Sequence, residues 1–140
     1  MAHWLLKSEP GTWSWDDQVK AGAKGTAWDG VRNHQAKQNL MKMKKGDRAF
    51  FYHSGEEKSV VGVVEIVGPH RPDPSDKTGA FVVVDVKAAA PMPEPVTLKM
   101  CKAEKGLAQM VLLNNSRLSV QPVTAAEWAI VCKLGGLKSA

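Results

Sequence analysis

The chain has 140 residues, of which 44% are hydrophobic and 24% are charged. This length and balance fit one globular domain, residues 1–140, and exclude a multidomain protein. No apolar run approaches the length of a membrane span, and the first residues lack the features of a signal peptide, so a cytoplasmic or nuclear location is expected. The two cysteines form no C-x-x-C pair, so we expect neither a disulfide framework nor a zinc site. Lys and Arg number 19 against 14 acidic residues, a net charge of +5 that favours a polyanionic partner without requiring one.

Tryptophan is unusually frequent, with five residues against one tyrosine and three phenylalanines. Large flat rings bury much area in a core, and they also stack on flat ligands. We expect Trp4 on an inner strand and Trp128 on an apolar helix face to pack in the core. Trp13 and Trp28 flank polar turns, where a flat ligand can stack, and Trp15 has no assigned role.

Short elements and turns alternate in the first part of the chain. A strand is predicted over residues 3–7, because the Glu-Pro-Gly that follows cannot continue a strand ladder. Ser14 and Asp17 have the spacing of a capping box, which predicts a short helix after Ser14. Asn33 is predicted to cap a second helix. Its apolar face is made by Ala36, Leu40 and Met43.

The middle of the chain is rich in strand-forming residues. Runs over 48–53 and 60–67 are dense in β-branched and aromatic residues around a polar turn, which predicts a hairpin buried on both faces. A Pro- and Asp-rich loop over 69–78 is predicted to precede a strand over 81–86. The Pro-rich segment 91–95 is predicted to be a rigid connector.

The last third is predicted to be mainly helical. We expect helical turns over 98–113, a strand over 117–122, and a helix that a capping box of Thr124 and Glu127 begins. Four to six short strands interrupted by helices, without a βαβ rhythm, indicate a small mixed α/β barrel. Such barrels bind ligands at a mouth or in a surface groove.

No catalytic motif of hydrolases, nucleotide-triphosphate enzymes, dinucleotide enzymes or zinc deaminases occurs in the sequence. Three clusters instead combine aromatic, polar and charged residues: 4–10, 28–33 and 114–122. The second precedes a helix N-terminus, whose free N–H groups can receive an anion or a carbonyl oxygen. Polar turn residues more often serve the backbone than a ligand, so the alternative to a binding role is that Asn33 merely caps a helix and Asp29 merely forms a turn.

Six blocks follow one another along the chain: WLLKSEP from residue 4, WDGVRN from 28, GDRAFFYHS from 46, VVGVVEIV from 60, VDVK from 84 and SRLSVQPVTAAEW from 116. Together they resemble the EVE domain family. The resemblance implies a PUA-like fold, a small twisted mixed α/β barrel of about five to six strands with flanking helices, related to YTH and ASCH domains. It also implies a non-catalytic reader of a modified base in DNA or RNA, either methylated or hydroxymethylated cytosine or methylated adenine, that needs no cofactor.

The expected base pocket has an aromatic wall made of Trp13 and Trp28. The groups expected to read the edge of the base are Ser8, Asn33, Tyr52, His53 and Ser116. A methyl group on the base is expected to contact Val31 or Leu118, and its burial is worth about 1 kcal/mol. The residues expected to hold phosphates are Lys7, Arg32, Lys37 and Arg117.

Two departures from the family pattern bear on this pocket. His34 stands where the family usually has tyrosine, which can alter the local ligand preference. The loop after Pro69 is shorter than in many members, which can open one side of the pocket.

Two alternatives remain open at the sequence level. One is a small enzyme of the ASCH type that acts on a modified nucleoside, since Lys7 and Glu9 point to the same face of an extended strand. The other is a nucleic-acid module that ignores base modification. The oligomeric state is also open, with a monomer expected because no apolar stripe remains once the core is assigned.

Overall fold

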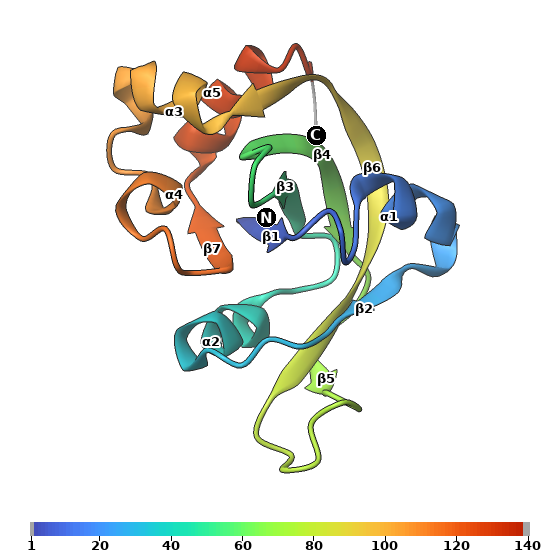
Figure 1. Ribbon diagram of the computed structural model, residues 1–140. Helices are drawn as coiled ribbons and strands as arrows, with labels where there is room; N and C mark the ends of the chain where they lie inside the picture. Colours follow the sequence, from blue (N-terminus) through green and yellow to red (C-terminus); the bar gives the residue numbers. More distant parts are fainter. Residues whose placement is uncertain (1, 139–140) are drawn as a thin grey trace.

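The computed structural model describes residues 2–138 and is organised around one curled sheet (Figure 1). The seven strands are β1 (His3–Ser8), β2 (Thr26–Trp28), β3 (Arg48–His53), β4 (Ser59–Ile66), β5 (Arg71–Pro72), β6 (Val82–Thr97) and β7 (Val120–Val123). The α-helices are α1 (Trp15–Ala21), α2 (His34–Lys42), α3 (Leu98–Ala103), α4 (Val111–Asn114) and α5 (Ala125–Leu134). Short 3-10 helices are η1 (Gly22–Lys24) and η2 (Lys105–Leu107).

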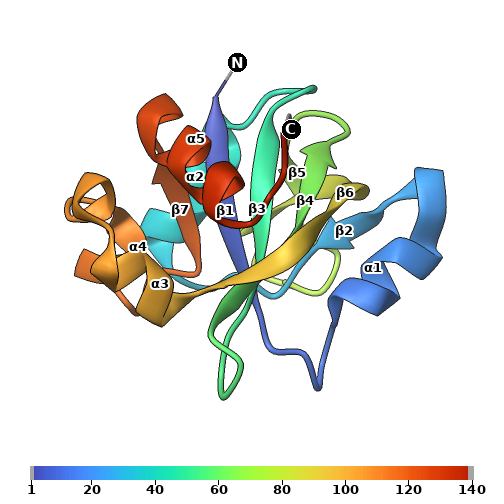
Figure 2. The same ribbon diagram turned by 90° about the horizontal axis from the view of Figure 1, so that it is seen from above.

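The strand order in the sheet is β2-β6-β4-β3-β1-β7, and β5 pairs with β6 beside this path. β1 and β3 run parallel, whereas the remaining pairs are antiparallel. Figures 1 and 2 show the strands wrapping around β1 and β3, with α3, α4 and α5 gathered beside β7 and α1 beside β2 and β6. The mixed α/β barrel expected from the sequence is confirmed, with seven strands in place of five to six.

Two core clusters lie on opposite faces of the central strands. Leu6 and Phe51 belong to the first cluster, which α2 covers. Leu5 and Phe50 belong to the second cluster, which α3 and α5 cover. Because successive side chains of a strand point to opposite faces, a continuous apolar run fills both clusters at once. The prediction that the strands around Phe50 are buried on both sides is therefore confirmed.

The helix caps expected from the sequence are present. The Ser14 hydroxyl accepts a hydrogen bond from the backbone N–H of Asp17, and the Asp17 carboxylate accepts one from the Ser14 N–H. Thr124 and Glu127 form the same reciprocal pair at the start of α5. Each pair satisfies two backbone N–H groups that a helix start leaves free. Among residues 2–138, no helix combines the length and the apolar character that crossing a membrane requires.

The prediction of a rigid connector over 91–95 is wrong, because these residues continue β6 to Thr97. Pro91 lies opposite Gly62 and Val96 opposite Val60, so the prolines between them fall at an irregularity in the ladder with β4. β2 pairs only with residues 84–86 of β6. The edge of β6 that faces away from β4 is therefore not paired with β2 at residues 91–95. Proline is tolerated at such bulges and open edges, since its missing N–H is not needed there.

Candidate functional site

The segment after β1 folds back on itself. The backbone N–H groups of Thr12 and Trp13 both donate to the Glu9 carbonyl, each at 2.9 Å. The Ser8 hydroxyl donates to the carbonyl oxygen of Trp13. These bonds bring the Trp13 side chain back beside the end of β1, where Ser8 is paired with His53 of β3.

β2 brings the second indole to the same place. Thr26 to Trp28 pair with Val86 to Val84 of β6, and Gly25 precedes them with a φ of 73°. A Cβ at Gly25 would lie 2.5 Å from the Val86 carbonyl oxygen, so the close approach of this segment to β6 requires glycine. Trp28 is buried, and its ring packs edge-on against Phe51 at 5.5 Å between centroids.

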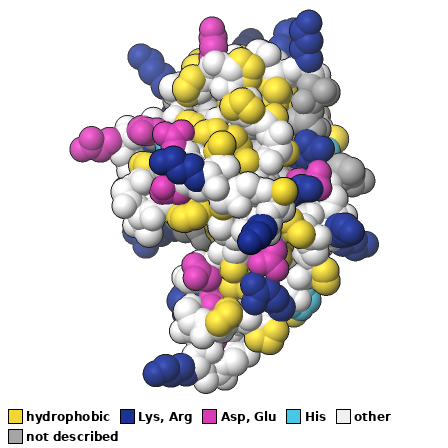
Figure 3. Space-filling view, turned by 90° about the vertical axis from the view of Figure 1, so that its right-hand side faces the viewer, with side chains coloured by type: hydrophobic (Ala, Val, Ile, Leu, Met, Phe, Trp, Pro, Cys, Tyr) yellow, Lys and Arg dark blue, Asp and Glu magenta, His cyan; other side chains and the backbone are white. Residues whose placement is uncertain are grey.

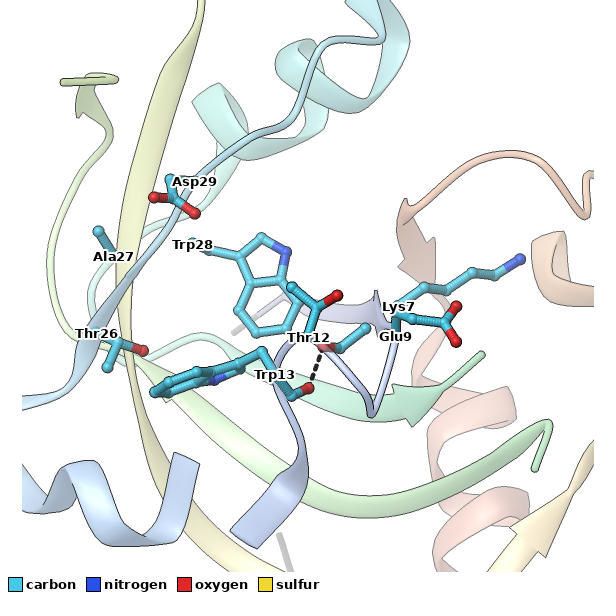
Figure 4. A pocket seen from close by; sticks show the side chains of 9 residues that line it. Lys7, Glu9, Thr12, Trp13, Thr26, Ala27, Trp28 and Asp29 are labelled. Atoms are coloured by element: carbon cyan, nitrogen blue, oxygen red, sulfur yellow. Dashed lines mark hydrogen bonds between the residues drawn. The ribbon is translucent and has the colours of Figure 1, made fainter. Parts of the chain in front are cut away.

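A cavity of about 500 Å³ opens between these two segments (Figure 4). It is lined by Lys7, Ser8, Glu9, Thr12, Trp13, Thr26, Ala27, Trp28 and Asp29. Figure 4 shows the Trp13 ring from its edge and the Trp28 ring from its face, so the two indoles form a corner rather than a parallel sandwich. The volume lies in the range of pockets that bind small molecules.

Gln18 fixes the indole of Trp13. Its Oε1 accepts hydrogen bonds from Trp13 Nε1 at 2.9 Å and from Thr26 Oγ1 at 3.2 Å, and its Nε2 donates to the Val86 carbonyl at 3.3 Å. The Gln18 side chain is fully buried. Gln18 therefore connects α1, β2 and β6 behind the cavity wall, a role that no local sequence pattern indicates.

Two charged residues at the rim already have partners. Lys7 Nζ donates to the carbonyl oxygen of Ser116 at 2.6 Å and lies 5.8 Å from the ring centroid of Tyr52. Burial lowers the pKa of Lys7 from its ordinary value. The Glu9 carboxylate accepts from the Ser54 hydroxyl at 3.4 Å. In Figure 4 the Lys7 ammonium is directed away from the two indoles.

Of the expected edge-reading residues, Ser8 is the one among the lining residues of the cavity. The Asn33 side chain accepts from the backbone N–H of Ala36 at 2.9 Å and caps α2. Tyr52 lies in the second core cluster, where burial raises its pKa to about 12. Ser116 is exposed and meets Lys7 through its carbonyl oxygen.

His53 is held by groups on both ring nitrogens. The backbone N–H of Trp15 donates to Nε2 at 3.0 Å, and Nδ1 lies 2.6 Å from the Glu57 carboxylate. This pairing places the proton on Nδ1 and the acceptor lone pair on Nε2. His53 thus anchors the start of α1 to β3 behind the cavity.

Val31 and Leu118, the residues expected to contact a base methyl, are buried in the first core cluster. Their side chains are 7% and 2% exposed and do not line the cavity. The apolar lining beside the indoles is Ala27. Thr26 and Ala27 were not expected, because a three-residue strand such as β2 shows no periodic pattern. Thr12, in the turn between β1 and α1, was not expected either.

Of the expected phosphate-binding residues, Lys7 lines the cavity, whereas Arg32, Lys37 and Arg117 are not among its lining residues. Arg32 pairs with Asp73 at 3.0 Å and lies 5.4 Å from the Phe81 ring, which also faces Lys37 at 5.8 Å. Arg117 is exposed. Figure 3, which looks onto the side that carries α1 and β6, shows Lys and Arg side chains interleaved with acidic ones. Within the described part of the chain, no three His, Cys, Asp or Glu residues are placed to hold a metal ion.

The tryptophans predicted for the core are confirmed there. Trp4 and Trp128 are each 6% exposed, and Trp128 stacks on Phe50 at 3.8 Å between centroids. Trp15 packs edge-on against Phe51 at 5.4 Å. A Cβ at Gly62 would lie 2.5 Å from the Trp15 ring, so this packing requires glycine on β4.

The curled sheet, its flanking helices and the cavity at the ends of β1 and β2 define a PUA-like domain. The chain belongs to the EVE domain family, which matches residues 2–134. Among curated relatives, thymocyte nuclear protein 1 of Homo sapiens is 36% identical over 95% of this chain and 73% of its own length. The Gallus gallus protein of the same name is 37% identical over 94% of this chain and 68% of its own length.

Solved structures show the same fold. A protein of Rhodopseudomonas palustris has a TM-score of 0.94 and 58% identity, covering 100% of this chain and 97% of that one. Human THYN1 in complex with 5-methylcytosine containing DNA has a TM-score of 0.88 and 35% identity, covering 99% of this chain and 100% of that one. An ASCH protein of Zymomonas mobilis shares the fold alone, with a TM-score of 0.58 and 11% identity over 96% of this chain and 99% of that one.

Proposed function

We propose that this protein is a non-catalytic reader of a C5-modified cytosine in DNA, which it accepts as a flipped-out or single-stranded base. The observation that carries the proposal is the cavity with Trp13 and Trp28 in its wall. The human relative solved in complex with 5-methylcytosine containing DNA supports this choice of base. Residues 1–140 form one domain in this proposal. The protein is then expected in the compartment that contains DNA, which is the cytoplasm of a bacterial cell or the nucleus of a eukaryotic cell.

Stacking supplies the affinity in this proposal. A base on one indole gains about 1–3 kcal/mol, which offsets a cost of a few kcal/mol for leaving a duplex. Phe51 holds Trp28, and Gln18 holds Trp13, before any ligand arrives. Such pre-organisation reduces the entropy lost on binding.

The other expected site residues fall into two groups. We propose Ser8, Trp13 and Trp28 as residues at the base, because they line the cavity. The residues that hold the surrounding elements in place are Val31, Asn33, Tyr52, His53, Ser116 and Leu118. The residues proposed to meet the flanking phosphates are Lys7, Arg32, Lys37 and Arg117.

No catalytic step is included. Lys7 and Glu9, the pair that an amidohydrolase would need, each have another partner, the Ser116 carbonyl and the Ser54 hydroxyl. Incubation with acylated nucleosides followed by product analysis tests this point. If the wild type hydrolyses an acylated nucleoside and Lys7→Ala does not, the protein is an amidohydrolase and the proposal of a non-catalytic reader is overturned.

Fluorescence anisotropy at physiological salt tests the reader. The probes are oligonucleotides of identical sequence with cytosine, 5-methylcytosine, 5-hydroxymethylcytosine, adenine or N6-methyladenine at one position. We expect tightest binding to a C5-modified cytosine and a loss of about tenfold in Trp13→Ala, since one stacking contact disappears. Met41→Ala, an exposed site on α2, should bind like the wild type. Equal binding of all five probes would overturn the proposal.

A further inference from the structure

We infer that Asp29 makes the pocket selective for a base with an exocyclic amino group, so that it accepts 5-methylcytosine and rejects thymine. This inference rests on the proposed function, because it concerns the same cavity. The two bases have the same ring size and carry the same methyl group. Stacking and methyl contacts alone therefore cannot separate them, and a polar group in the pocket has to do so.

The polar groups of the cavity are mostly committed to the fold. The Ser8 hydroxyl donates to the Trp13 carbonyl, and the Thr26 hydroxyl donates to Gln18. The Lys7 ammonium donates to Ser116. Among residues 2–138, the Asp29 carboxylate forms no hydrogen bond and no ion pair, although it lines the cavity directly after Trp28. It is the lining carboxylate that remains available to accept a hydrogen bond from a ligand.

The fold does not need the Asp29 side chain for its turn. An aspartate that only forms a turn accepts a backbone N–H with its own carboxylate. Here Gly30 makes the turn with a φ of 75°, and its N–H donates to the Asp73 carboxylate at 3.1 Å. Trp28 on the other side is fixed by its pairing with Val84. The backbone of Asp29 is thus held on both sides while its carboxylate stays free.

A carboxylate accepts hydrogen bonds and cannot donate them at neutral pH. Figure 4 shows Asp29 next to Trp28 among the residues that line the cavity. In this proposal, a base stacked on the Trp28 indole presents its edge to the Asp29 carboxylate. The 4-amino group of cytosine can donate to this carboxylate. Thymine and uracil present a 4-oxo group instead, and the carboxylate would lose water without gaining a donor. A single such contact is worth about ten- to hundredfold in affinity between the right and the wrong base.

The experiment compares single-stranded oligonucleotides that differ in one base: cytosine, 5-methylcytosine, uracil or thymine. Single strands remove the contribution of pairing from the comparison. For the wild type we expect 5-methylcytosine to bind about ten- to hundredfold more tightly than thymine. In Asp29→Asn the carboxamide can accept from the amino group or donate to the oxo group, so the ratio should fall to about threefold or less.

Asp16→Asn is the matched control, because Asp16 is an exposed acid on α1 outside the cavity. It removes the same charge and should keep the wild-type ratio, and a thermal melt shows that each variant is folded. If 5-methylcytosine binds no better than cytosine, the proposed function fails. If 5-methylcytosine exceeds cytosine but thymine binds equally well, or if Asp29→Asn keeps the full discrimination, the role of Asp29 is overturned while the reader stands.

Discussion

Gln18 shows how one buried polar side chain holds the cavity wall. Its amide oxygen accepts from both Trp13 and Thr26. In Gln18→Leu, the indole N–H and the hydroxyl lose this acceptor in a part-buried place, which costs about 1–3 kcal/mol. We expect urea denaturation to show that loss in the free energy of unfolding, whereas Gln38→Leu on the exposed side of α2 should change little. Equal stability of the two variants would contradict this role of Gln18.

Gly62 leaves the space that the ring of Trp15 occupies. A Cβ at this position would meet ring atoms of Trp15 at 2.5 Å. Gly62→Ala should therefore displace the ring and lower the free energy of unfolding by about 1–3 kcal/mol, as overpacking does. Gly11→Ala is the control, since no atom lies within 4 Å of its added Cβ. If thermal melts of the two variants coincide, Trp15 is less tightly held than the structure indicates.

The hairpin formed by β5 and β6 is joined to the cavity rim through Asp73. The Asp73 side chain is fully buried and accepts from Gly30, Arg32 and Ser75. Burial on its own would raise the pKa of Asp73, but the hydrogen bonds from Ser75, Arg32 and Gly30 outweigh it and lower the pKa to about 2. The ionised carboxylate is therefore part of the connection between the hairpin and the turn after Trp28.

The pKa of Asp73 gives this connection a pH dependence. Because the folded-state pKa lies below the ordinary value of 3.8, the stabilisation is complete above about pH 4 and is lost as the pH falls through about 2. The difference corresponds to about 2 kcal/mol. Asp73→Asn should lose that amount at pH 7 in urea denaturation and show a flatter decline between pH 4 and pH 2 than the wild type. A decline as steep as that of the wild type would assign the acid sensitivity to other carboxylates.

The helices and strands that were predicted correctly have a local sequence pattern, such as a capping box or an apolar run. Ser14 and Thr124 each start a helix through a capping box, and the apolar run around Phe50 forms a buried strand. The Pro-rich segment 91–95 was predicted to be a connector. No local sequence pattern shows that this part of β6 lies at an irregularity in the ladder with β4, where proline is tolerated. β2 was missed because its three residues are a strand only through pairing with Val84 to Val86.

The residues of the candidate site also fall into those that a local sequence pattern indicates and those that it does not. Trp13, Trp28 and Ser8 were expected and line the cavity, because each belongs to a polar turn beside a strand end. Gln18 has no sequence signal, since its role depends on β6, which lies 68 residues away along the chain. A site assembled from the ends of β1 and β2 across the whole sheet is set by long-range pairing, which short patterns do not contain.

At the scale of the whole molecule, the net charge of +5 should act through a few dispersed contacts. Four proposed phosphate contacts predict that the logarithm of the association constant falls with the logarithm of the salt concentration with a slope of about −3 for single-stranded DNA. Removing one contact in Lys37→Gln should reduce the slope by about 0.7 and leave the ratio between 5-methylcytosine and cytosine unchanged, because phosphate contacts carry no base information. Anisotropy titrations over a salt series measure both quantities. Lys102→Gln on α3, which packs on the core cluster away from the cavity, should keep the wild-type slope. An equal change of slope in both variants would mean that DNA is attracted by overall charge rather than by contacts at particular residues such as Lys37.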